Sequence, residues 1–406
     1  MKILIVNAVN DILSTGRFCS ELKDYLIQNG HSCFVAYSTG RQTENSFQIS
    51  STIECKIHAL MSRLTGMQGY FSLFSTRKLI NYIKEYEPDI VQLNNLHANY
   101  IHLSKLLDYL AKKNIATVVT LHDCWFYTGK CTHYTSIQCM KWKTGCFDCP
   151  KLKDDHNSWF FDRTPVLWSE KKEKFSSIFQ LAVIGVSDWI TNEAKQSFLS
   201  GAKIIKRIYN GIDLTKFKPN ENSQIKKKLG IMTCKIILGV ASEWNNKKGL
   251  DKFINLSPEL KEDERIVLVG KYKNNIKLPD NIISIPQTNN VEELVAFYSA
   301  ADVFLQLSEE ETFGKVVAES LACGTPVITN NKTANPELVN STCGIVLENL
   351  DEKTIRMALD EVFTRGKEYY SDNCVAHVVQ CYDIDKCMQE YLQTYMELDN
   401  RKMILK

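Results

Sequence analysis

Two glutamates and the segment between them have the residue types of a ligand site. Glu311 and Glu319 stand eight positions apart, and the apolar run at 301–307 before them is typical of a buried parallel strand. A helical pattern extends from Phe313 to Cys323. In an open parallel sheet, ligands bind at the carboxyl ends of strands, where the amino termini of helices lie. Because ionised carboxylates accept hydrogen bonds, the pair is expected to hold hydroxyl groups of a ligand.

The start of this predicted helix is suited to phosphate. The backbone N–H groups of Phe313, Gly314 and Lys315 lie where a helix leaves its donors without intrahelical partners, so they can bind phosphate oxygens. Gly314 has no side chain, which lets a ligand approach the backbone. The alternative is that Glu319 lies on a solvated helix surface and that Glu309–Glu311 are an acidic loop. The motif by itself leaves both interpretations open.

The composition is that of a globular protein long enough for two domains. The 406 residues are 44% apolar and 24% charged, and the formal net charge of +2 argues against a nucleic-acid binder. No apolar run reaches the roughly 18 residues that a membrane span needs. A cytoplasmic location is expected, in which the fourteen cysteines stay reduced. A peripheral contact with the inner face of the cytoplasmic membrane is compatible with this expectation.

Helices alternate with short apolar strands along the chain, which predicts an α/β protein with two doubly wound parallel sheets. The first domain is expected at 1–205, with a cysteine-rich insertion at 124–150. The second is expected at 206–375, and 376–406 is expected to be a C-terminal helix that packs back on the first domain. Residues 41–74 show no firm pattern and suggest a mobile loop.

The loops that follow the strands of the first domain contain further candidates. Ser14-Thr15-Gly16 is expected in the loop after the first strand, although a helix cap explains it equally well. His122 and Asp123 follow the strand at 117–121, at the edge where ligands bind. Asn95 and His97 follow the preceding strand and are interpreted as structural residues.

The insertion holds four cysteines within nineteen residues, at Cys131, Cys139, Cys146 and Cys149. Four thiolates can bind a structural zinc ion tetrahedrally, but only the last two cysteines have the usual two-residue gap. The alternative is a group of reduced thiols that pack as small apolar side chains with Trp142 and Phe147. Both interpretations stay open.

These segments resemble the family-four retaining glycosyltransferases over nearly the whole chain. Glu311-Thr312-Phe313-Gly314 through Glu319 is similar to the family's two glutamates separated by seven residues, with Thr312 where glycine is commoner. The segment 210–217 is similar to the family's signature at the domain junction, and 244–249 to its donor-phosphate loop. The cysteine-rich insertion is similar to that of a colanic-acid-type branch found in bacterial capsule and exopolysaccharide clusters.

The resemblance implies a GT-B fold, in which two Rossmann-like domains face a central cleft. It also implies retaining transfer of a sugar from a UDP-, GDP- or ADP-sugar to a hydroxyl of a saccharide acceptor, including lipid-linked acceptors. The pathway would be surface polysaccharide biosynthesis. Catalysis in this fold requires no metal or other cofactor.

The resemblance also implies residue roles. Glu319 would bind the ribose hydroxyls of the donor, and Ser14-Thr15-Gly16 would border the acceptor and the phosphates. The catalytic residues would be His122, Glu311 and Lys248. Further donor contacts would come from Lys247, Thr312, Phe313, Gly314 and Lys315. Glu243 stands where the family often has an arginine, and since a glutamate cannot stabilise a diphosphate, Lys247 is a candidate substitute.

The expected chemistry is displacement of a nucleoside diphosphate from an anomeric carbon by an acceptor hydroxyl. Fixed donors and a cation at the leaving phosphate would stabilise the charge that develops there. Front-face attack, with the leaving phosphate accepting the proton, is favoured over a covalent intermediate on Glu311. The alternatives are a non-catalytic nucleotide-sugar-binding protein and another enzyme of the same architecture, such as a nucleotide-sugar epimerase or a phosphorylase.

Overall fold

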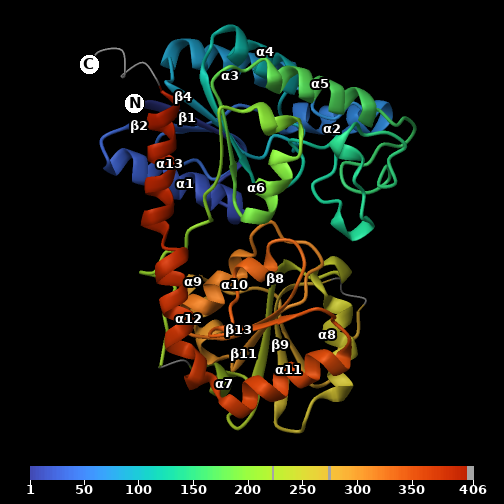
Figure 1. Ribbon diagram of the computed structural model, residues 1–406, viewed down its shortest axis with the longest axis vertical. Helices are drawn as coiled ribbons and strands as arrows, with labels where there is room; N and C mark the ends of the chain where they lie inside the picture. Colours follow the sequence, from blue (N-terminus) through green and yellow to red (C-terminus); the bar gives the residue numbers. More distant parts are fainter. Residues whose placement is uncertain (222–223, 273–275, 400–406) are drawn as a thin grey trace. The chain divides into compact units, whose positions relative to one another are not determined.

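The computed structural model describes residues 1–221, 224–272 and 276–399 (Figure 1). The chain divides into two compact units. The first contains Met1–Ile208 and the C-terminal segment from Met388, and the second contains Tyr209–Cys387. The last part of the expected C-terminal helix segment, 400–406, lies outside the described residues.

The first unit is built on a seven-stranded sheet in the order β3-β2-β1-β4-β5-β6-β7, and every pair of neighbours is parallel. The strands are β1 (Lys2–Asn10), β2 (Ser32–Gly40), β3 (Ser46–Gln48), β4 (Ile90–Leu93), β5 (Ala116–Leu121), β6 (Leu181–Gly185) and β7 (Ile204–Arg207). The strands β4, β5 and β6 are buried along their whole length because helices cover both faces of a parallel sheet.

Six helices of the first unit precede its last strand: α1 (Leu13–Gln28), α2 (Thr52–Thr65), α3 (Leu73–Tyr86), α4 (Leu103–Lys112), α5 (Thr164–Ser176) and α6 (Asp188–Lys195). In Figure 1, α3, α4 and α5 lie on one side of the sheet, and α1 and α6 lie on the other. The sheet order reverses between β1 and β4. Ligands of doubly wound sheets bind at the carboxyl ends of the strands at such a reversal.

The second unit repeats this plan with a six-stranded parallel sheet in the order β10-β9-β8-β11-β12-β13. The strands are β8 (Lys235–Glu243), β9 (Glu264–Lys271), β10 (Ile282–Ile285), β11 (Val303–Gln306), β12 (Val327–Asn330) and β13 (Gly344–Leu347). The helices are α7 (Ile225–Lys228), α8 (Leu250–Leu256), α9 (Val291–Ala300), α10 (Lys315–Ala322), α11 (Glu352–Arg365) and α12 (Lys367–Cys381). Here the order reverses between β8 and β11.

The last helix among the described residues is α13 (Ile384–Leu398), which begins in the second unit and belongs to the first from Met388 onward. Within the first unit, the ring of Tyr391 packs against Phe18 of α1 at 5.3 Å between centroids. The predicted fold class, with two doubly wound parallel sheets, is confirmed.

Two local predictions were wrong. Residues 41–74 form β3, α2 and the start of α3 instead of a mobile loop. Ser14, Thr15 and Gly16 lie in the first turn of α1, not in a loop before it. The helix predicted near 313–323 is present as α10, and it begins at Lys315 because Gly314 takes a left-handed conformation at its amino-terminal cap.

Candidate functional site

The reversal point of the second sheet brings Lys248 and Glu311 together. Lys248 ends a short 3₁₀ helix, Asn246–Lys248, that follows β8, and Glu311 lies in the loop that follows β11. Because β8 and β11 are neighbours, both loops leave the sheet at the same edge. The Lys248 Nζ atom is 2.6 Å from Glu311 Oε1, and neither side chain is fully buried. A cation and a carboxylate thus meet where ligands bind in this type of sheet.

The lysine loop has a defined backbone. The Asn245 side chain accepts a hydrogen bond from the Lys248 N–H at 3.2 Å. Gly249 follows with φ of +78°, and a Cβ atom placed there would lie 2.6 Å from the carbonyl oxygen of Leu307. Only glycine fits this close approach, which holds the loop against the end of β11. Lys247 and Glu243, the two other residues considered for the diphosphate, are both exposed.

The glutamate loop leads into the amino terminus of α10. The Glu311 N–H donates to Thr333 Oγ1 at 3.0 Å, and the Glu311 carbonyl accepts from the Ala334 N–H at 3.2 Å. Gly314, the N-cap residue of α10, has φ of +85° and no side chain of its own to cap the helix. The positive end of this helix therefore lies beside Glu311, where it favours an anionic group.

Glu319 lies on the second turn of α10 and is largely buried. Its Oε2 atom accepts a hydrogen bond from the Tyr298 hydroxyl at 3.0 Å, which fixes the carboxylate. Phe313, before the helix, packs against Tyr209 and Tyr382. The structure thus brings Glu311, Lys248 and the start of α10 together, with Glu319 further along the helix.

In the first unit, His122 lies just beyond β5. Its Nε2 atom is 3.1 Å from Asn94 Oδ1, and Phe18 packs edge-on against its ring at 5.1 Å. Burial lowers the pKa of His122 to about 4, so the ring is neutral at pH 7. Since the Asn94 oxygen can only accept, the Nε2 atom of His122 carries the proton.

The neighbouring Asp123 bonds to a histidine that the sequence analysis interpreted as structural. Asp123 Oδ2 is 2.8 Å from His97 Nε2, and Asp123 Oδ1 accepts from the Trp125 N–H at 2.8 Å. Burial opposes ionisation of Asp123, but His97 and these hydrogen bonds lower its pKa to about 2. The two side chains come from loops after neighbouring strands, and no local sequence signal pairs them.

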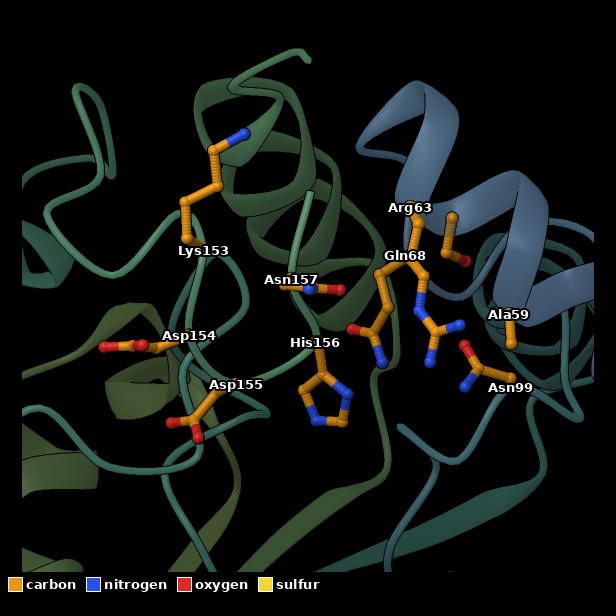
Figure 2. A pocket seen from close by; sticks show the side chains of 10 residues that line it. Ala59, Arg63, Gln68, Asn99, Lys153, Asp154, Asp155, His156 and Asn157 are labelled. Carbon is orange, nitrogen blue, oxygen red and sulfur yellow. The ribbon is translucent and has the colours of Figure 1, made fainter. Parts of the chain in front are cut away.

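A cavity of about 360 Å³ opens at the same edge of the first sheet (Figure 2). Arg63 on α2, Gln68 and Asn99 converge there with His156, whereas the carboxylate of Asp154 points away from them. The His156 ring packs on His97 at 4.8 Å between centroids. Burial, and then His97, lowers the pKa of His156 to about 3, which leaves it neutral. The cavity is therefore lined by two cations, Arg63 and Lys153, by the acidic Asp154 and Asp155, and by several neutral hydrogen-bonding groups.

The cysteines of the insertion form thiol contacts. Among the described residues, no group of three or more His, Cys, Asp or Glu side chains is placed to share a metal ion. Cys131 donates to Cys149, which lowers the pKa of Cys149 to about 7, while Cys146 accepts from the Gly129 N–H. The alternative prediction, that the thiols pack with Trp142 and Phe147, is only partly right. Trp142 is buried, but Phe147 is exposed.

Two buried lysines contact the loops in and beside the insertion. Lys130 donates to the carbonyls of Leu152 and Asp154, and Lys171 donates to those of Trp125 and Thr128. Each ammonium thereby satisfies carbonyl groups that loops leave without partners.

Two family models match the chain, one to each half. "Glycosyltransferase Family 4" matches residues 15–216, and "Glycosyl transferases group 1" matches residues 221–372. The chain belongs to the family-four glycosyltransferases. It is a nucleotide-sugar-dependent glycosyltransferase, and the predicted family is confirmed.

Individual relatives of this glycosyltransferase are distant. N-acetyl-α-D-glucosaminyl L-malate synthase of Bacillus anthracis is 25% identical over 53% of the chain, and the match spans 59% of that enzyme. The putative colanic acid biosynthesis glycosyl transferase WcaC of Escherichia coli K12 is 22% identical, over 80% of the chain and 82% of the relative. The similarity to WcaC does not establish a polysaccharide pathway.

The fold of the glycosyltransferase is that of solved structures. Anabaena Alr3699/HepE, solved in complex with UDP, matches with a TM-score of 0.68 and 15% identity, over 98% of this chain and all of that one. The likeness confirms the predicted GT-B fold. None of the described helices is long and apolar enough to cross a membrane.

Proposed function

We propose that the protein transfers a sugar, with retention of configuration, from a UDP-sugar to a saccharide acceptor. The Lys248–Glu311 pair beside the amino terminus of α10 carries this proposal. A diphosphate needs cations and N–H donors, and a sugar needs a carboxylate for its hydroxyls; the second unit has all three at one edge. The UDP held by the similar HepE structure supports uridine as the donor base.

In the proposed transfer, Lys248 leaves Glu311 and binds the diphosphate. Ion pairs between partly exposed groups contribute only about 0–1 kcal/mol, so a doubly charged phosphate readily displaces the carboxylate. Glu311 is then released to accept hydrogen bonds from the donor sugar. Lys248 and the helix terminus stabilise the charge on the leaving diphosphate. That phosphate accepts the proton of the attacking hydroxyl, so no other base is required.

The remaining site residues have supporting roles in this proposal. Glu319, whose second oxygen is fixed by Tyr298, binds the donor ribose, and His122 acts in the transfer step as a neutral imidazole. The main chain of Phe313, Gly314 and Lys315 binds phosphate. Thr312 and Lys247 complete the donor contacts, and Ser14, Thr15 and Gly16 border the acceptor.

The acceptor is proposed to be a saccharide joined to a lipid through phosphate. Arg63, in the cavity of the first unit, suits a phosphate, because a guanidinium presents several fixed N–H donors to oxygen anions. An exposed apolar stripe of α2, formed by Ile53, Ile57 and Leu60, runs along the same helix. This apolar stripe suits contact with the lipid part of the acceptor. It also supports peripheral contact of the protein with the inner face of the cytoplasmic membrane during surface polysaccharide synthesis.

A donor-binding experiment tests the proposal. The melting temperature is measured with UDP-, GDP- and ADP-sugars for the wild type, Lys248→Ala and Lys227→Ala. Lys227 is an exposed lysine of α7 in the same unit and serves as the matched control. A ligand at 100 times its Kd adds about 2.7 kcal/mol, so a UDP-sugar should raise the melting temperature of the wild type and Lys227→Ala but not of Lys248→Ala.

Three results would count against the proposal. Equal stabilisation of all three proteins would remove Lys248 from the donor site. No stabilisation by any nucleotide sugar would favour a non-catalytic or acceptor-dependent protein, with Glu243 as the residue to explain. Donor binding without any transfer to lipid-linked acceptors would leave the donor site intact and overturn the acceptor class.

A further inference from the structure

A chain of buried hydrogen bonds connects α13 to His122. The Tyr395 hydroxyl donates to Gln92 Oε1. The Gln92 amide donates to Asn94 Oδ1 at 3.4 Å and to Thr120 Oγ1 at 3.3 Å. Asn94 Oδ1 in turn accepts from His122 Nε2 at 3.1 Å. Tyr395, Gln92, Asn94 and Thr120 are all fully buried.

The positions of these side chains follow from the sheet. Gln92 and Asn94 are two residues apart at the end of β4, so they face the same side, and Thr120 and His122 do the same at the end of β5. The two strands are neighbours, with Gln92 opposite Val118. A glutamine in an otherwise apolar strand is costly to bury unless its amide is satisfied. Tyr395 and Asn94 satisfy its two ends.

A second contact joins α13 to the same histidine. Phe18 packs edge-on against His122 and also packs against Tyr391, one turn before Tyr395 on α13. The ring of His122 is therefore fixed from two directions, by a hydrogen-bond chain that ends at Tyr395 and by an aromatic side chain that rests on Tyr391.

We propose that Tyr395 is a positioning residue for the transfer reaction, which fixes the orientation and tautomer of His122 through Gln92 and Asn94. This inference rests on the proposed role of His122. The Tyr395 hydroxyl orients the Gln92 amide, and the amide nitrogen then orients the Asn94 oxygen towards His122. An oxygen at this place keeps the proton on Nε2 of the imidazole. Without the tyrosine hydroxyl the Gln92 amide is free to turn over, and both tautomers of His122 become accessible.

The test compares two tyrosines of the same helix. Tyr395→Phe removes the hydroxyl that starts the chain, and Tyr391→Phe removes one that lies outside it, while both keep their rings. Two-dimensional NMR of the histidine ring nitrogens reports the tautomer of His122 directly, in the full-length protein and without substrate. The resonance is assigned with His122→Gln. We expect a single Nε2–H tautomer in the wild type and in Tyr391→Phe, and a mixture in Tyr395→Phe.

Kinetics with the donor provide the second readout. Tyr395→Phe should lower kcat about tenfold with little change in the KM for the donor, as is typical when a group that orients a functional histidine is removed. Gln92→Met should have a similar effect, and the double variant should be no worse than either single one, because both break the same chain. Tyr391→Phe should keep the wild-type kcat.

Two outcomes would overturn the inference. One is an unchanged tautomer in Tyr395→Phe. The other is a double variant whose losses multiply, which would mean that Tyr395 and Gln92 act independently. The NMR measurement does not depend on turnover, so a failure of the proposed function can be told apart from a failure of this inference. If only the proposed function fails, the wild type does not bind the donor but its His122 tautomer is still fixed.

Discussion

At the scale of single residues, the proposed donor site depends on backbone as much as on charge. Lys248 and Glu311 are brought to 2.6 Å by loops that follow neighbouring strands. The sequence predicted both residues, because each belongs to a short local motif. It could not predict that Asp123 bonds to His97, since the residue types alone do not determine which side chains meet across two loops.

Gly249 should be indispensable to the lysine loop. Gly249→Ala introduces a Cβ atom 2.6 Å from the Leu307 carbonyl and forces the loop to shift, so donor affinity should fall at least tenfold. Gly230→Ala is the matched control, because Gly230 also has a positive φ, of +70°, but nothing lies within 4 Å of its Cβ position. Each variant should lose about 1 kcal/mol of stability from backbone strain. Titration with UDP-sugar separates the two effects, and equal donor affinities would contradict this role for Gly249.

Three histidines of the first unit with lowered pKa values should make it sensitive to acid. Burial lowers the pKa of His58 and His122 to about 4 and that of His156 to about 3. As the pH falls through 6.5, the unfolded chain takes up protons at these histidines and the folded chain does not, so the unfolded state gains stability. The free energy of unfolding should therefore fall between pH 6.5 and 4, by up to about 1.4 kcal/mol per pH unit for each histidine. Urea unfolding at pH 7.5 and 5.5 checks this, and equal stabilities would contradict it.

At the scale of elements, α2 explains why the sequence analysis failed at 41–74. This helix buries His58 and Ser62 and exposes Ile53, Ile57 and Leu60, the inverse of the pattern that indicates a helix on a globular core. The reversed pattern conceals the helix from periodicity arguments. An aromatic loop, Trp159–Phe161, is exposed beside it, and its Trp159 N–H donates to the Arg63 carbonyl at 2.7 Å.

The apolar stripe of α2 should bind lipid. Its neighbours Lys56 and Arg63 are exposed cations, which suits an anionic membrane surface. The double variant Ile53→Ser, Ile57→Ser should lose most flotation with vesicles that contain phosphatidylglycerol. Met357→Ser is the control, because Met357 is an equally exposed apolar residue on α11 of the second unit. Flotation of the double variant at the wild-type level would exclude this stripe as the contact surface.

At the scale of the whole molecule, the alternation of strands and helices was enough to predict two parallel sheets. The same reasoning could not predict what α13 contacts, because Tyr395 and Gln92 are 303 positions apart and neither belongs to a recognisable motif. It also could not predict that two buried lysines, Lys130 and Lys171 of α5, donate to loop carbonyls in and beside the insertion, because these contacts join residues far apart in the sequence.

Removing α13 from Met388 onward should separate donor binding from sugar transfer. A chain that ends at Cys387 keeps the whole second unit and should keep UDP-sugar binding. Its first unit loses the aromatic contacts of Tyr391 and the hydrogen bond of Tyr395, so amides of β4 and β5 should exchange with solvent faster and transfer should be lost. Hydrogen exchange and nucleotide titration test the two parts. A chain that ends at Asp399, which keeps all of α13, is the control. If the amides of β4 and β5 exchange faster in this control as well, α13 is not what protects them.

The division of the chain also sets an order of events during synthesis. The first unit is interrupted at Ile208 and resumes only at Met388, so the ribosome must add the 179 residues of the second unit before it reaches the C-terminal part of the first. At roughly 5–20 residues per second, this takes about 10–40 s. During that time the nascent first unit exposes the apolar surface of Phe18 that α13 later covers. The second unit, although translated later, is therefore complete before the first.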